Sequence, residues 1–65
     1  MEAENNVRAI LERAIDVLGS EAAAHEWVDK RSATLGGIPR EVSQNDEGMQ
    51  RVLFHLSGIS RHRFG

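Results

Sequence analysis

Three clusters of helix-breaking residues divide this chain into short segments. They are Gly19-Ser20, residues 35–39 (LGGIP) and residues 45–48 (NDEG). Glycine accepts the left-handed conformation that ends a helix, whereas serine, asparagine and proline favour a helix start. The order of these residues predicts helical segments that are joined by tight corners.

The segments between the clusters have helical periodicity. Apolar residues recur at a 3/4 spacing from Val7 to Leu18, and Ile15 and Val17 widen this face, so we expect the first helix to be covered on two sides. We expect a second helix over residues 21–31, a short third helix over residues 39–43, and a last helix with Asn45 as its N-cap, fraying at Gly58 into a short basic end. The predicted core consists of Leu11, Ala14, Leu18, Ala24, Trp27, Leu35, Ile38, Val52, Leu53 and Leu56.

These patterns predict an all-α fold, a compact bundle of four helices with the third one short, in a single domain over residues 1–65. Domains below roughly 70–80 residues usually depend on disulfides, a metal or a partner for stability. The chain has no cysteine, so association remains, and we expect a homodimer. The initial Met1 favours a complete natural protein.

Charge and hydropathy limit the choice of partners and location. A net charge of −2 gives no general reason to bind nucleic acid. Apolar runs are far shorter than the ~20 residues of a spanning helix. The N-terminus lacks the basic and apolar regions of a signal peptide. We therefore expect no membrane association and a cytoplasmic location.

No pattern in the chain indicates catalysis or a cofactor. His25, His55 and His62 form no HExxH motif and no pair at i, i+4, so we interpret them as surface or half-buried side chains. Gly36-Gly37 lacks the phosphate-binding patterns and is interpreted as a sharp turn that brings Leu35 and Ile38 into the core. We therefore predict that the chain is not an enzyme and holds neither a cofactor nor a metal.

Phe54 lies off the inward face of the last helix, which favours a dimer or partner contact or a second core face. Arg61-His62-Arg63 is the basic cluster of the chain; its cations stabilise a helix C-terminus or give weak, salt-sensitive binding to nucleic acid. The alternative function is therefore a small nucleic-acid-associated transcriptional regulator that also uses the Gly19-Ser20 corner as a helix-turn-helix. Against it, the second helix is alanine-rich and acidic at its start, a poor composition for reading a DNA groove.

The breaker residues have a further significance when their order is considered together. The series Leu18-Gly19-Ser20, Ala23 or Ala24, Trp27-Val28, Leu35-Gly36-Gly37, Pro39, Glu47-Gly48, Val52 and Leu56 resembles the C-terminal toxin-binding domain of Xre/MbcA/ParS antitoxins. The resemblance covers about residues 8–65. Its motif residues include Gly19, Ser20, Trp27, Leu35, Gly36, Gly37, Pro39 and Gly48.

The resemblance implies a small helical domain that dimerises and neutralises a RES-domain toxin, which consumes NAD, by occluding its cofactor pocket. It implies no catalytic residues. The implied partner-binding residues are Phe54, Ile59, Arg61, His62, Arg63, Phe64 and Gly65. A dimerisation module of this family without a toxin partner is the third alternative.

The chain departs from the family pattern in two places. The last segment of the family commonly reads LGRIEHGVF, and here Ile59 and Phe64 keep their places, but Gly58 replaces the usual arginine and His62 the usual glycine. Family members usually carry an N-terminal DNA-binding region, whereas few residues precede the first helix here. We therefore do not expect direct DNA binding.

Overall fold

Four helices make up the described part of the chain: α1 (Glu2–Leu18), α2 (Glu21–Val28), α3 (Pro39–Val42) and α4 (Asp46–Phe64). The computed structural model describes the backbone of residues 2–64 and the side chains of residues 3–59. Within residues 2–64 there is no strand, and an isolated bridge joins Ser32 to Gly37. The predicted all-α fold with a short third helix is confirmed.

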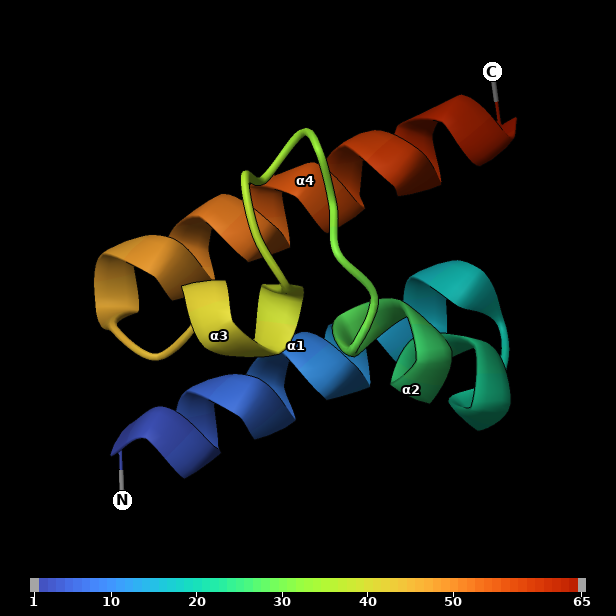
Figure 1. Cartoon of the computed structure of the whole chain (residues 1–65). Coiled ribbons are helices and arrows are strands. Elements are labelled where there is room, and N and C mark those ends of the chain that lie inside the picture. Colours follow the sequence, from blue (N-terminus) through green and yellow to red (C-terminus); the bar gives the residue numbers. More distant parts are fainter. Residues whose placement is uncertain (1, 65) are drawn as a thin grey trace.

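The two long helices, α1 and α4, pack against each other, and the shorter elements lie around them (Figure 1). α2 packs on α1, and α3 contacts the early part of α4. The segment between α2 and α3 rises across α4 before it returns to α3 (Figure 1). This arrangement leaves one long side of α4 without a helical neighbour.

Local chemistry explains the corner between α1 and α2. Gly19 adopts a positive φ of 87°, and its backbone N–H donates to the carbonyl oxygen of Ile15 at 2.8 Å, which closes α1. Ser20 is the N-cap of α2, and its Oγ accepts a hydrogen bond from the backbone N–H of Ala23 at 3.1 Å. The tight corner that the sequence predicts is therefore present.

α2 ends earlier than predicted, at Val28 rather than near residue 31. Asp29 is the C-cap, and the N–H of Lys30 donates to the carbonyl oxygen of Trp27 at 3.2 Å in a tighter closing turn. Asp29 has its own partner, because its carboxylate binds Arg40 in α3. α2 therefore ends before Lys30 and Arg31, and the Asp29–Arg40 pair joins its end to α3.

The connection between α2 and α3 folds back on itself at Gly36, which has a positive φ of 76°. The N–H of Ser32 donates to the carbonyl oxygen of Gly37 at 2.9 Å, and the N–H of Gly36 donates to that of Ser32 at 2.9 Å. Leu35, at the tip, is only 5% exposed. The turn therefore places Leu35 in the core, as predicted, whereas Ile38 is only half-buried.

The junction of α3 and α4 is closely packed. Pro39 is the first residue of α3 and is buried. The N–H of Gly48 donates to Oδ1 of Asn45 at 2.7 Å, which confirms the N-cap prediction for α4. A Cβ on Gly48 would overlap the carbonyl oxygen of Val42 and lie 2.8 Å from its carbonyl carbon. Glycine is therefore required where α3 approaches α4.

α4 is longer than predicted, because it continues through Gly58 to Phe64 instead of fraying at that glycine. Gly58 has no positive φ, so its backbone is compatible with a regular helix. A single mid-helix glycine costs up to ~1 kcal/mol and does not by itself end a helix. Across residues 2–64, no helix combines the length and apolar character needed to cross a membrane.

The core is aliphatic and lies between α1, α2 and α4. Five predicted core residues are buried, whereas Leu11, Leu18, Trp27, Ile38 and Leu53 are only half-buried. The prediction omitted Ile10, Val17 and Val28, which are 0–5% exposed. α1 contacts both α2 and α4, so it buries two faces, and residues beside the main apolar stripe enter the core. The buried residues of this hydrophobic core are Ile10, Ala14, Val17, Ala24, Val28, Leu35, Val52 and Leu56.

Candidate partner-binding surface

α4 has two faces of different character. Val52 and Leu56 are completely buried on its inner face. On its outer face, four residues at a 4-3-4 spacing, Glu47, Arg51, Phe54 and Gly58, form what we call the outer stripe. This spacing places side chains in one row along a helix.

Phe54 is the feature that distinguishes the outer stripe. Its side chain is 79% exposed, the one large apolar side chain so exposed among the described residues. A groove of about 650 Å³ lies beside it, with Leu35 and Thr34 of the connecting segment as one wall and six residues of α4 as the other. Its surface is mostly apolar and carries charged residues at its edge, a composition typical of a protein-docking surface. The α4 residues that line it are Glu47, Gln50, Arg51, Phe54, His55 and Gly58.

Arg51 fixes the wall of this groove. Its Nη2 donates to the carbonyl oxygen of Leu35 at 3.1 Å, which ties the connecting segment to α4. The bond satisfies a carbonyl at the tip of the turn and leaves the other guanidinium donors available. The groove therefore has a defined shape before any partner arrives.

Behind the groove, His55 stacks on Trp27, with ring centroids 6.1 Å apart and an angle of 16° between the planes. The stack joins α4 to α2. Trp27, predicted as a core residue, is half-buried and packs on the margin of the core rather than within it. Val28, its neighbour in sequence, is 0% exposed and occupies that place.

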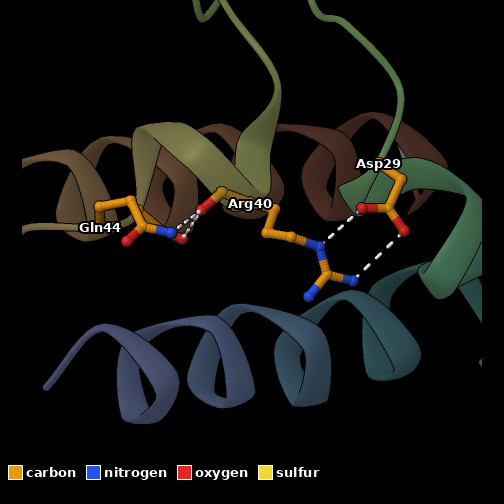
Figure 2. Close-up of polar contacts among 4 residues, drawn as sticks. Asp29, Arg40 and Gln44 are labelled. Carbon is orange, nitrogen blue, oxygen red and sulfur yellow. Dashed lines mark hydrogen bonds and ion pairs between the residues drawn. The ribbon is translucent and has the colours of Figure 1, made fainter. Parts of the chain in front are cut away.

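At the other side of the molecule, Arg40 joins α3 to the end of α2 (Figure 2). Its Nε donates to Oδ1 of Asp29 at 2.6 Å, and its Nη2 donates to Oδ2 at 3.2 Å. The hydrogen bonds from Arg40 hold the pKa of the Asp29 carboxyl below its ordinary value, and the same contact raises the pKa of Arg40. This bidentate pair closes the base of the connecting segment.

Sequence reasoning missed the Asp29–Arg40 pair. The available signal was weak, because Asp29 lay inside the helix expected over residues 21–31 and only Arg40, in the first turn of the next helix, stood at a helix end. A second groove, of about 490 Å³, lies beside Arg40 between α1 and α3. It is lined by Val7 and Leu11 together with charged and polar residues, and it exposes no large apolar side chain.

The structure separates the predicted partner-binding residues into three groups. Phe54 is exposed beside the groove. Ile59 is half-buried and packs against the core, which holds this part of α4 to the rest of the molecule. Arg61, His62, Arg63, Phe64 and Gly65 lie outside the residues whose side chains the structure describes.

The histidines and acids do not converge on a metal site in the described part of the chain. His25 is exposed, His55 stacks on Trp27, and the third histidine, His62, lies outside the described side chains. Within residues 3–59, no group of three or more His, Cys, Asp or Glu side chains has the arrangement to hold a metal ion.

Comparison with protein families identifies a family. The model of the antitoxin Xre/MbcA/ParS C-terminal toxin-binding domain matches residues 13–60, about three quarters of the chain. The matched range includes α2, α3, the connecting segment and the whole outer stripe. No curated protein and no solved structure matches the chain.

Proposed function

The chain belongs to the antitoxin Xre/MbcA/ParS C-terminal toxin-binding domain family, and on that premise we propose that it neutralises a RES-domain toxin that consumes NAD. The family match over residues 13–60 is the observation that carries this proposal. The chain acts as an inhibitory binding module in the bacterial cytoplasm. No bond-making step is assigned to its residues.

The proposed mechanism is occlusion of the cofactor pocket of the toxin by the C-terminal end of α4. Leu56 is completely buried and Ile59 packs on the core, so the helix is held firmly up to this point. The backbone then continues as a helix to Phe64, at one end of the molecule (Figure 1). A helix that is ordered before binding loses less conformational entropy on docking than a flexible tail does. This supports a rigid blocking element.

The test is coexpression with a RES-domain toxin encoded beside the gene, followed by purification. We expect growth to be restored, a stable complex to be recovered, and NAD consumption by the purified toxin to stop when the chain is added. Failure to form a complex with any neighbouring toxin would contradict the proposed function.

A separate variant of the chain tests whether the C-terminal end of α4 occludes the pocket. Deletion of Arg61–Gly65 should leave the thermal unfolding transition in place but restore NAD consumption in the complex. The matched control replaces these five residues with a Gly/Ser sequence of equal length. If both variants inhibit as well as the natural chain, the neutralising contact lies elsewhere on the surface.

A further inference from the structure

We propose that the outer stripe of α4 pairs antiparallel with the outer stripe of a second copy of the chain, so that each Phe54 occupies the groove of its partner. This goes beyond the proposed function, because it requires no toxin. It assigns an occupant to the groove beside Phe54 and a register to the helix pair.

The first observation is that the groove and an exposed side chain suited to fill it, Phe54, occur on the same chain. The groove of about 650 Å³ has a mostly apolar surface and needs a bulky apolar side chain to exclude water from it. Phe54, 79% exposed at its edge, is such a side chain. In a twofold dimer both copies use the same surface, so each Phe54 is buried and each groove is filled by the Phe54 of the other copy.

The second observation concerns Gly58. A Cβ at this position would meet nothing within 4 Å, and the residue has no positive φ, so neither packing nor backbone conformation within the chain requires glycine. At Gly48, by contrast, the carbonyl of Val42 leaves no room for a side chain. Glycine in a helix also allows the close approach of another backbone. An approaching helix from a second copy accounts for Gly58.

The third observation is the register. With the twofold axis between residues 52 and 53, an antiparallel pair places Phe54 of one copy opposite Arg51 of the other, and Gly58 opposite Glu47. Each of the four residues of the outer stripe thus faces an outer-stripe residue of the other copy. Arg51 is already held by the carbonyl of Leu35, so its guanidinium is positioned to contact the ring of Phe54 through a cation–π interaction. Identical charges do not face each other.

The size of the contact suits a chain of this length. A standard interface buries about 800 Å² per partner, and this is roughly a sixth of the 4527 Å² of accessible surface. α4 is 19 residues long, so about 28 Å of helix is available in a molecule whose longest dimension is 34 Å. The connecting segment adds Thr34 and Leu35 to the contact.

The oligomeric state of the purified chain tests the surface. By sedimentation equilibrium we expect twice the chain mass of 7.2 kDa, and we expect Phe54→Glu to weaken self-association by about a hundredfold or more. Because Phe54 is exposed, the helical circular dichroism signal should not change. The matched control is Ala22→Glu, at an exposed position of α2, which should remain dimeric.

The register has a separate test, because the natural chain contains no cysteine. Helix axes about 8 Å apart bring facing Cα atoms within the ~7 Å range of a disulfide. Mixing Glu47→Cys with Gly58→Cys chains should therefore give an oxidised heterodimer much faster than mixing Ala22→Cys with Gly58→Cys.

Three results would overturn the proposal. They are a natural chain that stays monomeric at high concentration, a Phe54→Glu chain that stays dimeric, and equal cross-linking of both cysteine pairs. If the natural chain is monomeric and Phe54→Glu instead loses toxin binding, the groove belongs to the toxin. Because the oligomeric state is measured without a toxin, its outcome is independent of the proposed function.

Discussion

Two glycines in α4 should respond in opposite directions to the same substitution. Gly48→Ala adds a methyl group where the carbonyl group of Val42 and Oδ1 of Asn45, 3.2 Å away, already occupy the space. Gly58→Ala adds the same methyl group where nothing lies within 4 Å. The chain thus contains its own matched control for the packing of α3 against α4.

The magnitudes follow from two effects. Replacing glycine by alanine inside a helix stabilises the folded state by about 0.5–1 kcal/mol, and this applies at both positions. At Gly48 the methyl group also forces two backbone segments apart, and overpacking of this kind costs typically about 1–3 kcal/mol or more. We therefore expect Gly58→Ala to be stabilising and Gly48→Ala to be destabilising by about 1–2 kcal/mol. For 65 residues the total free energy of unfolding is about 3–10 kcal/mol, so both changes are measurable.

The assay is thermal unfolding followed by circular dichroism. Both substitutions should be placed in the Phe54→Glu background, because association through the outer stripe would otherwise contribute at Gly58. Since 1 kcal/mol shifts the Tm of a small domain by about 4–8 °C, we expect Gly58→Ala to melt a few degrees higher and Gly48→Ala several degrees lower. An equal rise in Tm for both variants would refute the close approach of Val42 to Gly48.

Two further perturbations address the Asp29–Arg40 pair and the core. Arg40 holds the pKa of the Asp29 carboxyl below its ordinary value of about 3.9, so the pair contributes stability above about pH 4 and loses it as the pH falls through the folded pKa. The Tm of Asp29→Asn should therefore decline less steeply on acidification than the Tm of the natural chain. An unchanged pH profile of Tm would argue against the pair. Leu56→Ala should lower the free energy of unfolding in urea by about 2–5 kcal/mol, because Leu56 is 0% exposed. Trp27→Ala should lower it by less, because Trp27 is half-buried. A larger loss of stability in Trp27→Ala than in Leu56→Ala would contradict the placement of Trp27 at the margin of the core.

The joints of the fold were predictable from the sequence because their chemistry is local. Gly19 ends α1 through its own backbone conformation, and Ser20 caps α2 through a hydrogen bond three residues away. Asn45 caps α4 in the same way. In each case the partner lies within one helical turn, so neighbouring residues carry the whole signal.

The positions that depended on distant segments were not predictable. α2 ends at Val28 with Asp29 as its C-cap, and the carboxylate of Asp29 is bound by Arg40, a residue of another helix. Trp27 and Val28 are adjacent, and periodicity alone does not say which of them faces the core. The direction from which α1 and α4 approach decides this, and it favours the smaller side chain.

The candidate surface was predictable in part. Phe54 lies off the inward face by spacing alone, which left a second core face and a contact with another molecule open, and the structure shows it exposed rather than in a core face. The groove beside it was not predictable, because one wall comes from the segment that holds Leu35, fixed there by Arg51. Sequence therefore identified Phe54 as lying off the inward face, but neither its exposure nor the groove beside it.

The distribution of aromatic side chains connects stability with association. The core is made of aliphatic residues, whereas Trp27 packs at its margin and Phe54 lies outside it. Aromatic rings bury more apolar surface than aliphatic side chains and are enriched in protein interfaces. A chain of 65 residues with no cysteine has little stability to spare, yet Phe54 is the one exposed large apolar side chain among residues 3–59. In an isolated copy the ring of Phe54 remains largely in water, and in the dimer proposed above it would be covered by the groove of the second copy.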